Sequence, residues 1–197
     1  MSKNKIKLIA FAGSTRRASL NKQLVKIAAK GAESAGADVT YIDLADYPMP
    51  LYDGDLEADG GYPENALKLK ALFRQTDGFL IASPEYNSGY SAVLKNTIDW
   101  ISRPATKDEP PLVGFDGKFA SLMAAAPGAL GGLRGLYQLR ELLMNMGVMV
   151  LPKMRAVNFA FKAFDDDAQL TDPATESAVK ALGTQLVQAT SKDGKET

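Results

Sequence analysis

Five short apolar runs, separated by segments with helical periodicity, constrain the fold of this chain more than any other feature. One of them, Gly78–Ser83, is apolar without alternation, which is typical of a strand covered on both faces and hence of a parallel sheet. Strands of this kind that alternate with helices predict an α/β fold, a doubly wound five-stranded parallel sheet with helices on both faces. The five runs are Ile6–Phe11, Val39–Leu44, Gly78–Ser83, Phe119–Ala126 and Val148–Leu151.

The segments between the runs predict helices and a few irregular connections in a single domain over 1–197. Leu133–Met146 is apolar nearly all round, which predicts burial on more than one side and a subunit contact. We expect irregular chain over Ala45–Tyr62 and Thr106–Lys118, find no clear pattern in Phe159–Leu170, and expect disorder over 191–197. The expected helices are Leu20–Ala35, one from Pro63, Ser91–Arg103, Leu133–Met146 and one from Asp172.

The chain contains neither cysteine nor histidine, and this absence restricts its chemistry. Zinc and iron–sulfur sites depend on those ligands, so both kinds of centre are unexpected. A cysteine nucleophile and a Ser-His-Asp triad are excluded for the same reason. An enzyme with this composition is expected to use a bound cofactor that carries the reactive electrons.

Charge and hydropathy point to no nucleic-acid or membrane partner. Lys plus Arg and Asp plus Glu number 23 each, so the net charge produces no field that favours nucleic acid or an anionic membrane surface. No stretch approaches the ~20 apolar residues needed to span a bilayer, and no signal-type segment follows Met1. A cytoplasmic location is the expectation.

The stretch Phe11–Asn21, between the first strand and the first helix, predicts an anion site. A helix N-terminus offers unpaired N–H groups and partial positive charge, and Arg16 can add a charge-assisted contact. Ser14, Thr15, Ser19 and Asn21 add side-chain donors. Neither G-x-x-x-x-G-K-[ST] nor G-x-G-x-x-G is present, so a terminal monophosphate suits the loop best. The alternative is a polar turn capped by Ser19.

Two further loops follow strands that end at the same edge of the predicted sheet. In Ser83–Tyr90, Tyr86 offers a flat face, and Asn87 with the neighbouring N–H groups offers a donor and acceptor edge that suits a planar heterocycle. Glu85, Tyr86 and Asn87 are consecutive at this ligand-facing end, which favours binding. The alternative is an ordinary turn with Tyr86 packed on the core. Pro127–Gly132 permits close approach of backbone to a ligand, although these residues alone favour a flexible turn.

Four motifs in this order resemble those of the NADPH-dependent FMN reductase family. They are Gly-Ser-x-Arg-x-x-Ser-x-Asn at 13–21, Ser-Pro-Glu-Tyr-Asn at 83–87, Leu-Lys-Asn-x-Ile-Asp-Trp at 94–100 and Pro-Gly-Ala-Leu-Gly-Gly at 127–132. The resemblance covers residues 6–152, and the family includes flavin, quinone, azo-dye and chromate reductases with a flavodoxin-like fold. Two departures are Ser91, where relatives often have proline, and Ala125 or Ala126, where they have a hydroxyl residue.

The resemblance implies a set of FMN-binding residues and no catalytic side chain. It assigns the FMN phosphate to the first loop, the isoalloxazine ring to the second, and the other side of the flavin to the third. The implied residues are Ser14, Arg16, Ser19, Leu20 and Asn21 in the first loop, Pro84, Glu85, Tyr86 and Asn87 in the second, and Pro127, Gly128, Gly131 and Gly132 in the third.

The implied activity is NAD(P)H oxidation with reduction of a small acceptor (flavin, quinone, chromate or an azo compound) by ping-pong hydride transfer through FMN. NADPH or NADH is the co-substrate, and a homodimer or homotetramer is expected from relatives. An alternative is a flavodoxin-type electron carrier without its own NAD(P)H oxidase activity. A third hypothesis is a subunit whose flavin pocket only regulates or scaffolds.

Overall fold

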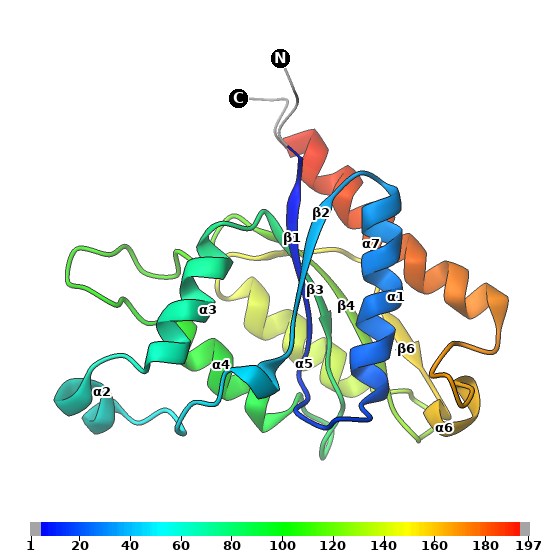
Figure 1. The fold of residues 1–197 in the computed structure, drawn as a ribbon, viewed down its shortest axis with the longest axis horizontal. Coiled ribbons are helices and arrows are strands. Elements are labelled where there is room, and N and C mark those ends of the chain that lie inside the picture. Colours follow the sequence, from blue (N-terminus) through cyan, green and yellow to red (C-terminus); the bar gives the residue numbers. More distant parts are fainter. Residues whose placement is uncertain (1–4, 194–197) are drawn as a thin grey trace.

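A computed structural model describes residues 5–193 of the chain and confirms the α/β fold (Figure 1). All strand pairs are parallel, and the order across the sheet is β2-β1-β3-β4-β5, with β6 also paired to β4. This order is that of a doubly wound sheet, in which ligands bind beyond the carboxyl ends of the strands. The strands are β1 (Lys7–Ala12), β2 (Asp38–Ile42), β3 (Gly78–Ala82), β4 (Phe119–Ala125), β5 (Met149–Val150) and β6 (Arg155–Val157).

The fifth position of the sheet differs from the prediction of one strand over Val148–Leu151. Two short strands share this position: β5 pairs with the start of β4 at Phe119, and β6 pairs with its end, up to Ala125. The chain between them contains Pro152, which has no N–H to donate to a ladder, so the pairing is interrupted there. β6 therefore extends the sheet to the edge where the loops of interest lie.

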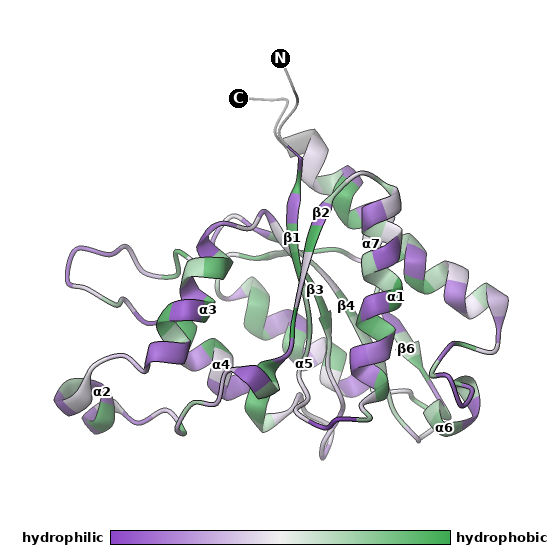
Figure 2. Ribbon diagram, viewed as in Figure 1, coloured by the Kyte–Doolittle hydropathy of each residue, from purple (hydrophilic) through white to green (hydrophobic). Residues whose placement is uncertain are grey.

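Helices cover both faces of the sheet, as predicted. α1 (Leu20–Ser34) and α7 (Pro173–Asp193) lie on one face, and α3 (Glu64–Arg74), α4 (Ala92–Ser102) and α5 (Leu133–Met144) lie on the other (Figure 1). The helices are banded with apolar and polar residues, as one-sided burial requires (Figure 2). The prediction of disorder from residue 191 was wrong for 191–193, because these residues belong to α7. Residues 194–197 lie outside the described residues.

α1 and α7 cross at glycines that allow their backbones to touch. A Cβ atom on Gly31 would overlap the carbonyl oxygen of Lys180, and one on Gly183 would overlap that of Ala28. Thr184 then donates its hydroxyl to the carbonyl oxygen of Gly31 at 3.1 Å. The close contact fixes α7 against α1, the helix that begins at the first loop.

The segment expected to be irregular over Ala45–Tyr62 contains the short helix α2 (Gly54–Gly60) and most of η1 (Leu44–Asp46). Asp53 caps α2 by accepting hydrogen bonds from the first-turn N–H groups, a local signal that the composition of the segment obscured. The segment is fixed to α4 by Trp100, whose indole N–H donates to the carbonyl oxygen of Pro50 at 2.8 Å.

The connection Thr106–Lys118 contains no helix or strand and is held by a buried ion pair. Lys70 and Glu109 form that pair, and both side chains are more than nine-tenths buried. Burial alone would raise the pKa of Glu109, but the N–H of Ala105 and the Lys70 ammonium together lower it below its ordinary value. Glu109 is therefore charged at neutral pH.

α5 does not bury all of its sides within this single chain. Its buried residues Gly135, Leu136, Leu139 and Leu143 face one side, whereas Tyr137 and Met144 are more than half exposed. The polar residues of α5 form a second face, so the prediction that this helix is apolar nearly all round was wrong. A subunit contact stays a prediction. Separately, no helix within 5–193 is long and apolar enough to cross a membrane.

Candidate functional site

The loops that follow β1, β3 and β4 converge on one pocket of about 170 Å³ at the carboxyl edge of the sheet. Most candidate residues line it, whereas Asn87, Gly128, Gly131 and Gly132 lie in the same loops but not in the lining. The candidates that line it are Ser14, Arg16, Ser19, Leu20, Asn21, Pro84, Glu85, Tyr86 and Pro127, and the residues that sequence reasoning did not select are Ala18, Ala125, Ala126, Ala160 and Phe161.

The first loop ends in a helix start whose N–H groups are available. Ser19 is the N-cap of α1 and accepts a hydrogen bond from the N–H of Lys22 at 3.4 Å. Within residues 5–193, no protein acceptor engages the backbone N–H groups of Ser19, Leu20 or Asn21. These groups and the helix dipole favour an anion at this position.

Arg16 is the cation of the first loop that lines the pocket. It is exposed, lines the pocket, and has no ion-pair partner among the described residues. The nearby ammonium of Lys22 is buried and lies 2.6 Å from a carboxylate oxygen of Asp43, so its charge is balanced. One free guanidinium and a helix N-terminus suit a single phosphate group.

Asn21 connects the first loop to the end of β4. Its amide nitrogen donates to the carbonyl oxygen of Ala125, and its amide oxygen accepts from the N–H of Ala125, both at 2.9 Å. β3 has already ended here, since Ser83 donates the last ladder bond on this side to Met123. The Asn21 side chain therefore takes the place of a further β3 residue and holds two loops in register.

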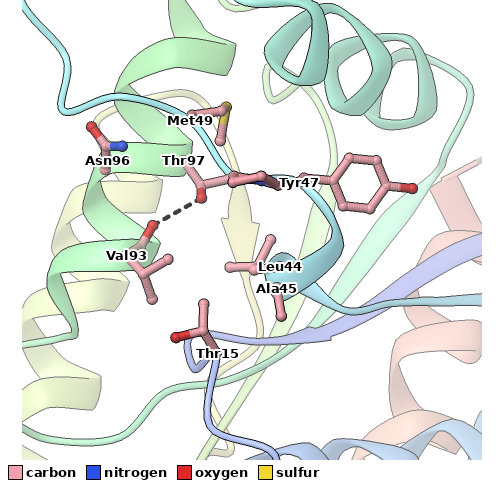
Figure 3. Close-up of a pocket in the computed structure, with 9 residues that line it drawn as sticks. Thr15, Leu44, Ala45, Tyr47, Met49, Val93, Asn96 and Thr97 are labelled. Carbon is pink, nitrogen blue, oxygen red and sulfur yellow. Dashed lines mark hydrogen bonds between the residues drawn. The ribbon is translucent and has the colours of Figure 1, made fainter.

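Thr15 points away from the first pocket, although the sequence offered its hydroxyl as a donor. It lines a neighbouring pocket of about 290 Å³, between the first loop, η1 and α4 (Figure 3). Thr97 of α4 lines the same pocket, and its hydroxyl donates to the carbonyl oxygen of Val93 at 2.8 Å. Ser14 and Arg16 thus face one pocket and Thr15 the other.

In the second loop, the carboxylate of Glu85 is bound to the start of α5. It accepts from the N–H of Gly135 at 3.0 Å and from the Arg134 guanidinium at 2.7 and 3.0 Å. Burial works to raise the pKa of Glu85, but these donors lower it below its ordinary value. Glu85 therefore lines the pocket as a charged and compensated group that positions the loop.

The rest of the second loop presents an aromatic face. Tyr86 is 54% exposed and lines the pocket. Its N–H and carbonyl both bond to Gly89, which closes a tight turn with Asn87 and Ser88 at positive φ. At the end of the loop, Ser91 caps α4 and donates its hydroxyl to the carbonyl oxygen of Gly13 at 2.6 Å. Serine therefore serves as the cap at this departure from the family pattern.

In the third loop, glycines are required by contacts within the protein. Gly131 and Gly132 have φ angles of 61° and 93°. A Cβ atom on Gly132 would lie 2.7 Å from Cβ of Ala124, and one on Gly131 would lie 2.7 Å from the backbone of Asn158. These residues allow the loop to pack on β4 and on the chain after β6.

Comparisons with known proteins identify relatives of this chain. The family model for NADPH-dependent FMN reductase matches residues 6–162. The chain is 34% identical to an NAD(P)H:quinone oxidoreductase of Solanum tuberosum over 182 residues, 90% of this chain and 89% of the relative. It is 33% identical to an NAD(P)H-dependent FMN reductase of Pseudomonas aeruginosa over 176 residues, 89% of this chain and 90% of the relative.

Two solved structures have a fold similar to that of this chain. The flavoenzyme NAD(P)H:(acceptor) oxidoreductase FerB from Paracoccus denitrificans superposes with a TM-score of 0.77 at 28% identity, covering 95% of this chain and 98% of that protein. An archaeal flavodoxin superposes with a TM-score of 0.61 at 13% identity, covering 94% and 99%, which shows the flavodoxin-like fold alone. With its family match, its relatives and its fold in agreement, the chain belongs to the NADPH-dependent FMN reductase family.

Proposed function

We propose that this protein binds FMN in the pocket between the three loops and uses it to reduce small acceptors with NAD(P)H. The observation that carries the proposal is one pocket that combines the free N–H groups of α1, the unpaired Arg16 and the flat face of Tyr86. The first two features suit a phosphate, and the third suits an aromatic ring system.

The residues present fit FMN, and each has a binding or positioning role. Arg16, Ser14 and Ser19 would hold the phosphate, while Pro84 and Tyr86 would line the ring. FMN supplies the hydride-accepting and electron-donating chemistry when bound. The carboxylate in the pocket is compensated by Arg134, so we assign no proton-transfer residue.

The remaining candidates act through the loops that they shape. Asn21 holds the first loop to β4, Glu85 holds the second loop to α5, and Gly131 and Gly132 let the third loop approach the sheet. The proposal therefore keeps these residues in the site but gives them positioning roles toward the cofactor.

Acceptors of the quinone class are proposed first, because the relatives include quinone oxidoreductases of Solanum tuberosum and Escherichia coli. The test is to measure flavin content and FMN affinity, and then to follow NADPH and NADH oxidation with 1,4-naphthoquinone. We expect FMN binding at micromolar concentration or tighter and quinone-dependent oxidation of NADPH or NADH. A protein that fails to bind FMN at that concentration would refute the proposal.

A flavodoxin-type carrier is the second candidate and is separated by the same assay. A carrier oxidises NAD(P)H only with a partner reductase, whereas the proposed enzyme needs none. The relatives at 33–34% identity are named as reductases, which favours the enzyme. A protein that binds FMN tightly without any turnover would instead favour a regulatory or scaffolding subunit.

The proposal also includes three points that rest on the sequence. The protein forms a homodimer or homotetramer, it has no nucleic-acid or membrane partner, and it is located in the cytoplasm. The exposed Tyr137 and Met144 of α5 give a surface on which a second copy can pack. Sedimentation equilibrium of the FMN-loaded protein measures the state, and a monomer at all concentrations would remove this part.

A further inference from the structure

The short helix α6 (Ala160–Ala163) forms part of the pocket wall, although no sequence pattern marks it. Its backbone is fixed to the third loop: the N–H of Ala160 donates to the carbonyl oxygen of Ala126 at 3.1 Å, and that of Phe159 donates to Gly128 at 3.4 Å. α6 lies beside the end of β6 at the loop edge of the sheet (Figure 1). Its position is therefore coupled to the loop that closes one side of the site.

The turn into α6 is strained. Phe159 has φ and ψ angles of 45° and 46°, a left-handed conformation that is unusual for a bulky residue. Such strain persists where the surrounding structure enforces it, and it is concentrated at functional sites. Here it starts the turn that places the next two residues in the pocket wall.

Ala160 and Phe161 have different roles in the pocket wall. Ala160 is 2% exposed and packs in the core, which anchors the helix. Phe161 lines the pocket, yet its side chain is 71% exposed, so the core does not need its ring. Tyr86, from the second loop, is the other exposed aromatic in the same lining.

The charges of the lining suit an uncharged molecule at this part of the pocket. Arg16 and Glu85 are the charged side chains among the described lining residues. The proposed function assigns Arg16 to phosphate, and Glu85 is compensated by Arg134. Ala126, Pro127 and Ala160, the other lining residues from the third loop and α6, carry no charge.

We propose that Phe161 is an acceptor-binding residue that stacks on flat, uncharged aromatic acceptors and so favours them over compact anions. This inference rests on the proposed function and concerns which acceptors the site selects. An exposed ring held by a rigid backbone gains contact area when a planar molecule enters, at little cost in side-chain freedom.

The test compares Phe161→Leu with the control Phe159→Leu in the FMN-loaded protein. Phe159 is also an exposed aromatic of this segment but does not line the pocket, and leucine meets the same backbone strain there. The readout is kcat/KM at saturating NADPH for 1,4-naphthoquinone and for ferricyanide, a compact anion. We expect Phe161→Leu to lower the naphthoquinone value roughly three- to tenfold, mainly through KM, and the ferricyanide value less than twofold.

A binding measurement keeps the test independent of turnover. Titration of the oxidised, FMN-loaded protein with 2-naphthol, a planar bicycle that is not reduced, is read from the flavin absorbance. In protein kept saturated with FMN, Phe161→Leu should weaken 2-naphthol binding by a similar factor, whereas Phe161→Trp should bind 2-naphthol as the wild type does. Phe159→Leu should match the wild type in every readout.

The outcomes separate this inference from the proposed function. Wild-type protein that does not bind FMN or reduce naphthoquinone refutes the proposed function itself. If the wild type is active, equal losses for both acceptors, or none, in Phe161→Leu overturn the role of Phe161. A shift in sedimentation equilibrium in that variant would mean that the ring packs on a second copy, which would also overturn it.

Discussion

Replacement of Asn21 by alanine tests the connection between α1 and the end of β4. The variant loses two hydrogen bonds from a side chain that is buried, and it leaves both backbone groups of Ala125 without their partner. Two bonds at a net value of about 1 kcal/mol each, together with partial desolvation of the freed groups, lower the free energy of unfolding by ~2–4 kcal/mol. The pocket admits water, which keeps the loss toward the lower part of this range.

Urea unfolding of the FMN-free protein, followed by circular dichroism, measures this loss. For a chain of this length, the same free energy corresponds to a fall of roughly 5–15 °C in Tm. The matched control is Ser34→Ala, since Ser34 is an exposed residue of the same helix that also donates a hydrogen bond to the backbone. That variant should stay within about 0.5 kcal/mol of the wild type. A loss below about 1 kcal/mol in Asn21→Ala would mean that water replaces the amide, and the reasoning would fail.

Three further predictions follow from the site and the fold. Arg16→Ala should weaken FMN binding by ~1.5–3 kcal/mol in a fluorescence titration, whereas Arg17→Ala, outside the pocket lining, should not; equal losses would refute the assignment of Arg16 to phosphate. Gly183→Ala should lower the free energy of unfolding by about 1–3 kcal/mol, despite the better helix propensity of alanine. The control Gly54→Ala, at a position with open space around it, should be neutral or stabilising. Similar values for the two variants would contradict the α1–α7 contact. Because the pKa of Glu109 is lowered in the folded state, its stabilising contribution is present above the ordinary glutamate range and is lost as the pH falls through that range and through the lowered pKa of the folded state. Urea unfolding between neutral and acid pH should show a smaller decline in Glu109→Gln, and parallel curves would argue against that role.

The strands and the convergence of the loops were predictable because both follow from short apolar runs that can be recognised in the sequence. Continuous apolar runs such as Gly78–Ser83 identify buried parallel strands, and the carboxyl ends of parallel strands share one edge. The positions of the first and second loops at a common pocket follow from that rule alone.

The parts that were missed depend on single residues or on tertiary contacts. β6 is three residues long after a proline, and α6 has four residues with one buried, so neither provides a periodic pattern. The bond between Asn21 and Ala125 joins positions 104 residues apart, which no local pattern encodes. The capping aspartate at 53 is a usable signal for α2, but the Gly and Asp residues that dominate the segment favour irregular chain and obscure it.

The contact between α1 and α7 has a consequence for synthesis of the protein. Agreement with the family model stops at residue 162, but the hydrophobic layer on this side includes Val179, Leu182 and Leu186. A ribosome that has made every strand of the sheet has still not supplied α7, which covers part of the apolar surface of α1. Nascent chains that end before α7 therefore expose part of the apolar surface of α1, and chaperones can bind a surface of this kind.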